Sequence, residues 1–442
     1  MISKTDLIEY FQSGCKKVHN LNIGVEHEKF LFQNKSGNRI NFEVVTKIFN
    51  FLEQFGWKTS KEKNNVVALH KDKKSITLEP GNQVELSGAP LKSIHENCSE
   101  SYAFLDELKK ACKKFDLKMI ATSYDPFSKL GSVPKSPKQR YKVMTDEMPK
   151  NGKLSLEMMY QTCGTQINLD YISEEDFVKK FKLSSFLVPL SIAIFANSPI
   201  KENKLTGYLS YRSKVWQNTS RGGLPKIFLE NMNFEKYVDM TMNTPLLFLF
   251  KNGNYLKTKG KTFKEFMEGK LPLDCYEKAN IKDFENHLAT IFTEVRLKKY
   301  IEIRSLDTCE WDCHCSGPAF YTGLLYGSLD EAFEIINKWS IEDVLNAYID
   351  APRKGFETVI ANKTLLEWGK IFLDLAKKGL LIRSVKNMSG KEEIIFLKSI
   401  ETILNNKTNK AMNTINKFKK DKMGGLFIHY WCIRRFKREL GQ

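Results

Sequence analysis

Four separated stretches of the chain alternate between apolar and polar residues, as strands with one buried face do. The first is GVEHEKFLF, Gly24 to Phe32, where Glu26 and Glu28 stand two positions apart and therefore share a face. The others cover residues 76–91, 166–170 and 294–304. We expect the second stretch to form a hairpin, because Pro80-Gly81-Asn82 is a turn signal, and the last to form one strand.

Helical periodicity fills much of the chain between and after these strands. Residues 1–20 predict a short helix, and apolar residues at helical spacing predict helices over 42–55, 91–115 and 181–195. Residues 124–141 contain three prolines among basic residues, which predicts an irregular loop. From about Gly327 onward the pattern is mainly that of amphipathic helices. The chain therefore predicts an α+β fold in which an antiparallel sheet packs on helices through one face and leaves the other open.

The open face of this sheet carries acids, amides and arginine where a solvated face would mix in lysine, threonine and serine. Its central positions are Glu26, Glu28, Glu79, Glu85, Gln166, Asn168, Glu302 and Arg304. Two carboxylates about 4 Å apart repel by about 4 kcal/mol at an effective dielectric of about 20, so converging acids need a cation. Magnesium held by carboxylates and substrate phosphates meets that need, and an arginine neutralises phosphate or carboxylate. Any one of these acids alone is better explained as a surface residue; together they indicate a site.

The chain has enough apolar residues for a large core, and it carries a formal charge of +17, from 69 Lys+Arg against 52 Asp+Glu. Such a charge attracts nucleic acid, anionic membrane or a polyanionic substrate such as a nucleotide. We assign most of it to a solvated surface, because the basic residues are spread along the whole chain. Nucleic-acid binding stays a distant alternative, since aromatic residues are interleaved with a C-terminal basic cluster: Lys417, Lys419, Lys420, Lys422, Arg434, Arg435, Lys437 and Arg438.

The sequence predicts neither export nor a membrane span. The first ten residues include Lys4, Asp6 and Glu9, so no apolar signal-peptide region is expected. The longest apolar stretch, residues 186–196, is interrupted by Pro189 and is shorter than the roughly 18 residues of a membrane span. We therefore expect a cytoplasmic protein that does not span a membrane, and in that compartment its nine cysteines predict free thiols.

Two features near the acids have more than one interpretation. The cluster Cys309, Cys313, His314 and Cys315 fits a zinc site, a local disulfide or thiols without a chemical role. His27 lies between the two glutamates of the first strand and faces its opposite side, which favours a packing role over that of a catalytic base.

The same stretches resemble the plant-type glutamate-cysteine ligases shared by plants and many proteobacteria. GVEHEKFLF and ITLEPGNQVELSGAPL resemble the first motifs of that family, and MMYQTCGTQINLD, GYLSYRSKVW and EVRLKKYIEIR resemble the later ones in the same order. The resemblance covers about residues 20–330. It implies a glutamine-synthetase-like fold in which a curved antiparallel sheet, surrounded by helices, forms an active-site funnel. We expect a catalytic core over residues 1–327 and a helical C-terminal subdomain over 328–442 packed on it.

The resemblance also implies a function: ATP-dependent ligation of the γ-carboxylate of L-glutamate to L-cysteine through γ-glutamyl phosphate, the first step of glutathione biosynthesis, by a monomer or homodimer. Mg²⁺, with Mn²⁺ as an alternative, would be held by Glu26, Glu28, Glu79, Glu85 and Glu302. Glu302 and Arg304 would be catalytic, and Arg304 and Arg296 would bind the nucleotide. The amino-acid substrates would meet Gln166, Asn168, Tyr208, Arg212 and Trp216.

One segment departs from the family pattern. Where the family has a glycine-rich run, this chain has bulkier residues over 305–309 and keeps only Asp307. A related ligase that joins glutamate to another amine is therefore the alternative function. The regulatory cysteine pair of plant-type members has no counterpart, since no cysteine lies between Cys163 and Cys275.

Overall fold

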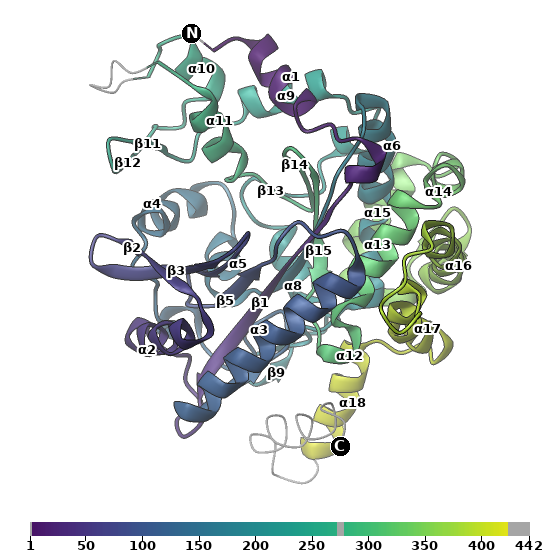
Figure 1. Cartoon of the computed structure of the whole chain (residues 1–442), viewed down its shortest axis with the longest axis horizontal. Helices are drawn as coiled ribbons and strands as arrows, with labels where there is room; N and C mark the ends of the chain where they lie inside the picture. Colours follow the sequence, from purple (N-terminus) through teal and green to yellow (C-terminus); the bar gives the residue numbers. More distant parts are fainter. Residues whose placement is uncertain (1, 272–277, 423–442) are drawn as a thin grey trace.

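One nine-stranded sheet, antiparallel in every pair, runs through the molecule (Figure 1). The structure is a computed structural model and describes residues 2–271 and 278–422. The strands lie in the order β14 (Val295–Leu297), β15 (Ile301–Asp307), β7 (Gly164–Leu169), β1 (Ile23–Gln33), β5 (Val84–Ser87), β4 (Lys74–Leu78), β3 (Asn65–Lys71) and β2 (Lys58–Glu62), and β6 (Leu117–Ile120) pairs with the end of β1.

The pairing register gathers the predicted polar positions on one face. Glu28 of the central strand β1 lies opposite Glu85 of β5. On the other side of β1, Glu26 lies opposite Gln166 of β7. Glu302 of β15 lies opposite Asn168 of the same β7. The α+β class and the antiparallel sheet with one polar face are thus confirmed.

The apolar face of the sheet packs on helices. Val25, Ile167 and Ile303 belong to one large buried cluster with residues from the helices that cover this face. These helices are α6 (Glu174–Phe186), α7 (Val188–Phe195), α13 (Ser316–Tyr326), α14 (Leu329–Ile336), α15 (Ile341–Lys354), α16 (Leu365–Arg383) and α17 (Lys398–Asn405). Figure 1 shows α13 to α17 together on the right of the sheet. The helices after residue 328 therefore share the core of the sheet, and a division at residue 327 stays a prediction.

A second cluster covers the other end of the sheet. Phe49 of α2 (Phe42–Leu52) and Leu108 of α3 (Ile94–Lys114) pack there with Leu69 of β3. Both helices fall where the periodicity predicts them. The predicted N-terminal helix is also present as α1 (Lys4–Gln12) and starts with a Ser3 capping box.

The remaining elements are shorter. Residues 124–141 are largely irregular as predicted, until α4 (Gln139–Glu147) begins. In Figure 1, α4 lies on the left together with α11 (Ile281–Leu288) and the hairpin of β11 (Leu249–Lys251) and β12 (Asn254–Leu256). The other elements are α5 (Ser155–Gln161), α8 (Tyr211–Trp216), α9 (Phe234–Asn243), α10 (Phe263–Met267), α11 (Ile281–Leu288), α12 (Trp311–His314), α18 (Lys410–Lys422), β8 (Ile200–Lys201), β9 (Lys204–Leu205), β10 (Gly222–Gly223), β11 (Leu249–Lys251), β12 (Asn254–Leu256), β13 (Phe292–Thr293), β16 (Val359–Ile360) and β17 (Lys363–Thr364).

Two predicted elements are wrong in detail. Residues 294–304 form not one strand but the hairpin of β14 and β15, which places Arg296 opposite Glu302. The turn at residues 298–300 contains no glycine, proline or asparagine, so the sequence gives no turn signal there. The apolar stretch over 181–195 is not one helix either: α6 ends at Phe186, and Pro189 lies in the first turn of α7, where proline is tolerated.

No helix in residues 2–271 and 278–422 has the length and apolar character needed to cross a bilayer. Of the basic residues behind the nucleic-acid alternative, Lys417, Lys419, Lys420 and Lys422 belong to α18. The others, Arg434, Arg435, Lys437 and Arg438, lie outside the described residues.

Candidate active site

Two carboxylates of β1 are held by the neighbouring strand β7. The Gly164 amide donates a hydrogen bond of 2.6 Å to Oε2 of Glu28, and Nδ2 of Asn168 donates one of 2.8 Å to Oε1 of Glu26. Burial raises the pKa of Glu28 to about 8, and the nearby charge of Glu79 adds to this effect. Arg212, the Gly164 hydrogen bond and Arg304 lower the pKa of Glu28, but by less than burial and Glu79 raise it.

Glu85 shares that environment. It is buried, and it accepts hydrogen bonds from Oγ1 of Thr77 at 2.8 Å and from Nε2 of Gln166 at 3.4 Å. Burial raises its pKa well above the usual range, and the charges of Glu79, Glu26 and Glu28 raise it further. Four of the predicted acids, Glu26, Glu28, Glu79 and Glu85, therefore lie near enough to repel one another. We call them the acid group.

Glu302 has the opposite environment. Its side chain is fully buried and is surrounded by three cations: Arg296, Lys298 at 3.0 Å and Arg304 at 3.1 Å. Burial alone would raise the pKa of Glu302, but these charges outweigh burial and hold the pKa well below its usual range. Glu302 is therefore a charge-compensated carboxylate, unlike the four members of the acid group.

Arg304 and Gln166 connect the two kinds of carboxylate. Arg304 donates from Nη1 to Glu302 at 3.1 Å and also donates to Oε1 of Gln166. Gln166 in turn donates to Glu85. The predicted catalytic, substrate and metal residues of three strands thus form one connected polar network.

No three His, Cys, Asp or Glu side chains in the described part of the chain converge closely enough to enclose a metal ion by themselves.

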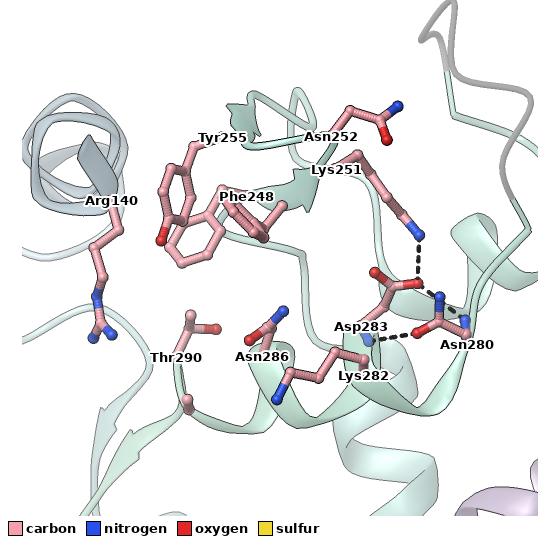
Figure 2. A pocket seen from close by; sticks show the side chains of 12 residues that line it. Arg140, Phe248, Lys251, Asn252, Tyr255, Asn280, Lys282, Asp283, Asn286 and Thr290 are labelled. Atoms are coloured by element: carbon pink, nitrogen blue, oxygen red, sulfur yellow. Dashed lines mark hydrogen bonds and ion pairs between the residues drawn. The ribbon is translucent and has the colours of Figure 1, made fainter. Parts of the chain in front are cut away.

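A cavity of about 440 Å³ lies close to this polar face. Figure 2 shows the side chains that line it. Arg140 lines one end of it, and the charges of Glu79 and Glu85 reach Arg140. Ala289 lines it as well, and the Ala289 carbonyl accepts a hydrogen bond of 3.2 Å from Arg296. The cavity is therefore next to both the acid group and the arginines of the network.

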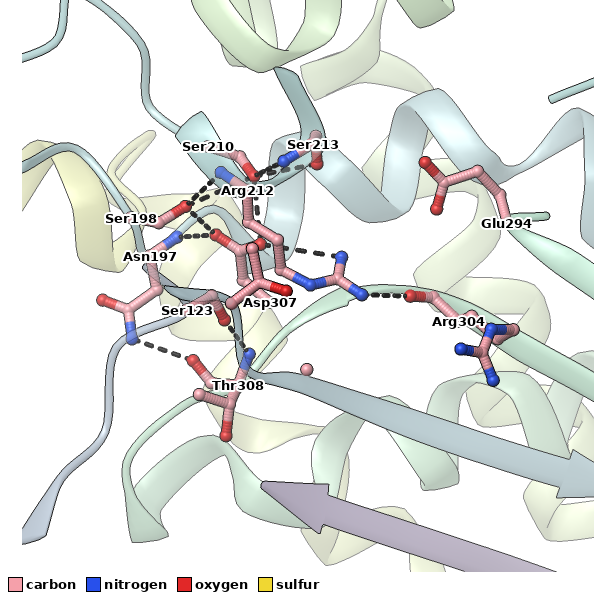
Figure 3. A network of polar contacts seen from close by, with 12 residues as sticks. Ser123, Asn197, Ser198, Ser210, Arg212, Ser213, Glu294, Arg304, Asp307 and Thr308 are labelled. Atoms are coloured by element: carbon pink, nitrogen blue, oxygen red, sulfur yellow. Dashed lines mark hydrogen bonds and ion pairs between the residues drawn. The ribbon is translucent and has the colours of Figure 1, made fainter. Parts of the chain in front are cut away.

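Arg212 enters the site from α8, beside Glu28. Its buried guanidinium donates a 2.7 Å hydrogen bond to the Arg304 carbonyl (Figure 3). It also lies 4.6 Å from the ring centre of Trp216. A Cβ atom on Gly164 would come within 2.8 Å of Nη2 of Arg212, so only glycine leaves room for it. Nε and Nη1 of Arg212 have no hydrogen-bond partner among the described residues, but Nη1 lies 4.0 Å from the Asp307 carboxylate, which leaves Nε as a donor for a ligand.

The comparisons with known proteins agree on what such a site belongs to. The model of glutamate-cysteine ligase family 2 (GCS2) matches residues 22–418. The chain belongs to this family. One relative of this family member is glutamate-cysteine ligase B, chloroplastic, of Oryza sativa subsp. japonica. It is 39% identical over 421 residues, which cover 94% of this chain and 84% of the relative. The chloroplastic glutamate-cysteine ligase of Solanum lycopersicum is 38% identical over 399 residues, covering 89% and 76%.

A solved structure supports the fold of this family member. The glutamate-cysteine ligase of Francisella tularensis in complex with AMP superposes with a TM-score of 0.51 and 13% sequence identity, over 91% of this chain and 85% of that one. At that identity the likeness concerns the fold alone, and it agrees with the fold class predicted from the sequence.

Asp307 is a residue of this family member whose importance the sequence only hinted at. Its buried carboxylate accepts hydrogen bonds from the Asn197 amide at 2.8 Å, Ser198 Oγ at 2.7 Å and Ser210 Oγ at 3.0 Å, and it lies 4.0 Å from Nη1 of Arg212 (Figure 3). Asp307 therefore holds the start of α8 and pairs with the guanidinium of Arg212. The sequence signal for Asp307 was that residues 305–309 depart from the family pattern and keep only this aspartate.

The bulky residues of that segment point away from the acid group. Leu306 packs in the main core, and Oγ1 of Thr308 accepts a 2.8 Å hydrogen bond from Nζ of the buried Lys29. Glu294, which the sequence did not single out as a site residue, is also buried and accepts a 2.8 Å hydrogen bond from Tyr348. Leu306 and Thr308, which depart from the family pattern, thus make their contacts in the protein interior.

Tyr208 is the predicted substrate residue that the structure does not bring to this network. Its ring lies 5.9 Å from the ring of Tyr211 and 5.0 Å from the Arg353 guanidinium. A role for Tyr208 toward substrate stays a prediction.

The histidine and the cysteine cluster behind β1 are structural neighbours. His27 is buried and its ring stacks on that of His314 at a centroid distance of 3.4 Å, which confirms the packing role. Cys309 and Cys313 form a disulfide, so of the three alternatives the structure has the local disulfide, and the free-thiol prediction is wrong for this pair. Cys315 is a free thiol.

Proposed function

We propose that this chain joins the γ-carboxylate of L-glutamate to the amine of L-cysteine with hydrolysis of ATP to ADP and phosphate. The observation that carries the proposal is the acid group beside Arg212, Trp216 and Arg304, in a chain of glutamate-cysteine ligase family 2. One side supplies negative charge for a phosphate-bound cation, and the other supplies cations for carboxylate and phosphate. Phosphoryl transfer needs both, since positioning and charge neutralisation carry most of its catalysis.

The proposed chemistry has two steps whose atoms balance. An oxygen of the glutamate γ-carboxylate attacks the γ-phosphorus of ATP, which releases ADP and leaves γ-glutamyl phosphate. The cysteine amine then attacks the acyl carbon, loses a proton and expels phosphate, which carries away one oxygen of the glutamate. No step uses a protein nucleophile, so neither the Cys309–Cys313 disulfide nor Cys163 takes part in the chemistry.

We assign the proposed divalent cation, Mg²⁺ or Mn²⁺, to the acid group: one or two of Glu26, Glu28, Glu79 and Glu85 would hold an ion together with substrate phosphates, since no three of them converge on one point. These carboxylates fit a hard cation because their mutual repulsion, visible in the raised pKa values of Glu28 and Glu85, is relieved by it. Such an ion would neutralise the polyphosphate of the nucleotide. Three cations already surround Glu302, so our proposal gives Glu302 the task of orienting Arg296 and Arg304 toward phosphate. That Glu302 is a fifth metal ligand stays a prediction.

Arg212 is the proposed anchor for an amino-acid carboxylate. Its Nε has no hydrogen-bond partner among the described residues, and its stacking on Trp216 leaves the guanidinium fixed for a contact with a carboxylate. Gln166 and Asn168 line the same face from β7. A cytoplasmic location and a monomeric or homodimeric state are further parts of the proposal that rest on the sequence alone.

A panel of amines tests the function. Purified protein is supplied with ATP, Mg²⁺, glutamate and one amine at a time, and ADP release and the ligation product are measured. We expect cysteine to be the best amine, with γ-glutamylcysteine as product. If cysteine releases ADP no faster than alanine or buffer, the proposed function is wrong, and a better amine in the panel would identify the related ligase that the changed segment at residues 305–309 suggests.

A further inference from the structure

Glu294 is a fully buried carboxylate to which the proposed reaction gives no role. It lies between β13 and β14, where its amide donates a 2.9 Å hydrogen bond to the Gly223 carbonyl and its carbonyl accepts one of 2.8 Å from the Arg304 amide. Oε1 of its side chain accepts a 2.8 Å hydrogen bond from the Tyr348 hydroxyl, whereas Oε2 has no partner among the described residues. One carboxylate oxygen is therefore held in place while the other is left for the site.

The hydroxyl that holds Glu294 comes from a helix of the C-terminal region. Tyr348 lies on α15, and its ring belongs to the main core. Its carbonyl accepts a 2.5 Å hydrogen bond from Nε2 of Gln217, the residue that follows α8. Tyr348 thus contacts Glu294 through its side chain and the end of α8 through its backbone. Because α8 carries Arg212, this tyrosine connects Glu294 with the helix of the proposed anchor.

The cations that face Glu294 are two arginines of the site. Figure 3 shows its carboxylate on the side of the Arg212 guanidinium, with Arg304 below it. Both guanidiniums lie over the ring of Trp216, at 4.6 Å and 5.2 Å from its centre, and the buried Nε of each has no hydrogen-bond partner among the described residues. Burial raises the pKa of Glu294, whereas the two guanidiniums and the Tyr348 hydroxyl favour its ionised form.

A second carboxylate near Arg212 shows how a purely structural acid is bonded here. Both oxygens of Asp307 accept hydrogen bonds, and Arg212 lies between this saturated carboxylate and that of Glu294 (Figure 3). A guanidinium attracted by Asp307 alone would turn toward it, whereas a second negative charge on the other side balances that attraction. The free oxygen of Glu294 is thus placed to decide where the Nε of Arg212 is directed.

We propose that Tyr348 and Glu294 are positioning residues for the amino-acid substrate: the Tyr348 hydroxyl orients the Glu294 carboxylate, and this carboxylate sets the direction of the Arg212 guanidinium. The inference rests on the proposed function, which makes Arg212 the anchor of a substrate carboxylate. It gives α15 a part in substrate binding in addition to its part in the core.

Variants of the two residues test the proposal. Tyr348→Phe removes only a hydroxyl, and Glu294→Gln removes the charge but keeps an acceptor for Tyr348. We measure kcat, the KM values for glutamate, ATP and cysteine, and the dissociation constant of glutamate by calorimetry. We expect the glutamate KM and dissociation constant to rise by about tenfold in Glu294→Gln and about threefold in Tyr348→Phe, with kcat and the KM for ATP unchanged. The double variant should be no weaker than Glu294→Gln, because Tyr348 acts through Glu294.

The pH profile separates positioning from a mere loss of stability. The Tyr348 hydroxyl favours ionised Glu294, so its removal raises the pKa of Glu294 further. If the ionised form directs Arg212, the acid limb of kcat/KM for glutamate moves to higher pH in Tyr348→Phe. The variant retains the other titratable and charged groups that act on Glu294 or respond to its charge: Arg212, Arg304, Asp307 and Tyr321.

Tyr326→Phe is the matched control. Tyr326 lies on α13, and its hydroxyl bonds to the backbone of Asn22 and Asp170, so the control should keep the wild-type glutamate KM and pH profile. A Tyr348→Phe variant that keeps both, or that changes only the melting temperature, would overturn the inference. So would a rise in the KM for ATP in place of that for glutamate. If wild-type protein binds glutamate and the variants weaken that binding, but no γ-glutamylcysteine forms, the proposed function fails while the positioning role stands.

Discussion

At the scale of single residues, the carboxylates of the sheet fall into two electrostatic kinds. Glu302 is compensated by Arg296, Lys298 and Arg304, so its charge is part of what holds the fold. Glu28 and Glu85 are buried near other acids, so their charges oppose the fold until a cation or substrate arrives. Substituting an acid of either kind should lower activity, but the effects on stability should have opposite signs.

The first prediction concerns Glu28→Gln, which we expect to lower turnover by about a hundredfold or more, since a carboxylate facing the phosphates is lost. A carboxyl whose pKa rises from 4.5 to about 8 on folding binds its proton more tightly when folded, so the free energy of unfolding falls as pH rises between these values. Without metal, the melting temperature of the variant should therefore fall less between pH 5 and pH 8 than that of the wild type. Glu175→Gln, at an exposed acid of α6, is the control. An unchanged pH dependence would contradict the buried, uncompensated state of Glu28.

The second prediction concerns Glu302→Gln. Removing one partner of a buried ion pair leaves its cations unpaired, which costs about 3 kcal/mol or more of unfolding free energy. On an open polar face, as the sequence suggests for Glu302, this loss of stability would not be expected; it follows from the full burial of Glu302 in the structure. Denaturant unfolding and ADP release are the measurements. A variant as stable as the wild type would show that the three cations do not depend on Glu302.

At the scale of elements, the alternating patterns of β1, β4, β5 and β7 were sufficient to predict the sheet and its polar face, because a period of two leaves one register that buries the apolar set. The turn between β14 and β15 was missed because the alternation continues through Lys298 and Tyr300 without a turn residue. The Arg140 cavity was missed for a different reason: α4, β12 and α11 are far apart in sequence, and no local pattern reports that they meet. The substrate role of Arg212 and Trp216 was implied by the resemblance to a known family, whereas their stacking is seen only in the structure.

The third prediction tests how closely α8 approaches β7. Gly164→Ala places a Cβ atom 2.8 Å from Nη2 of Arg212 and 3.2 Å from its Nε, so the guanidinium must move away from the Arg304 carbonyl. We expect the KM for glutamate to rise by about tenfold, because small displacements of an anchoring group are costly in such sites. Gly131→Ala is the matched control, since a Cβ atom there meets no atom within 4 Å. Wild-type kinetics in Gly164→Ala would show that Arg212 does not anchor the substrate.

At the scale of the whole molecule, one sheet brings three regions together: the acid group, the arginines around Trp216 and the cavity lined by Arg140 and Tyr255. The helices on the opposite face, including those after residue 328, share the core with the apolar side of the same strands. The site is thus assembled from segments between residues 26 and 307 and is supported by the C-terminal helices from behind. Because the C-terminal helices support the strands of the site, the family match extends beyond those strands and covers residues 22–418.

The central claim, that the chain activates glutamate as an acyl phosphate and passes it to cysteine, is tested most directly by following oxygen. Glutamate labelled with ¹⁸O in its γ-carboxylate is incubated with the protein, ATP, Mg²⁺ and cysteine, and the released phosphate is analysed by mass spectrometry. The proposed function predicts γ-glutamylcysteine and phosphate that carries one ¹⁸O atom for each ligation. Unlabelled phosphate, released together with the product, would contradict it.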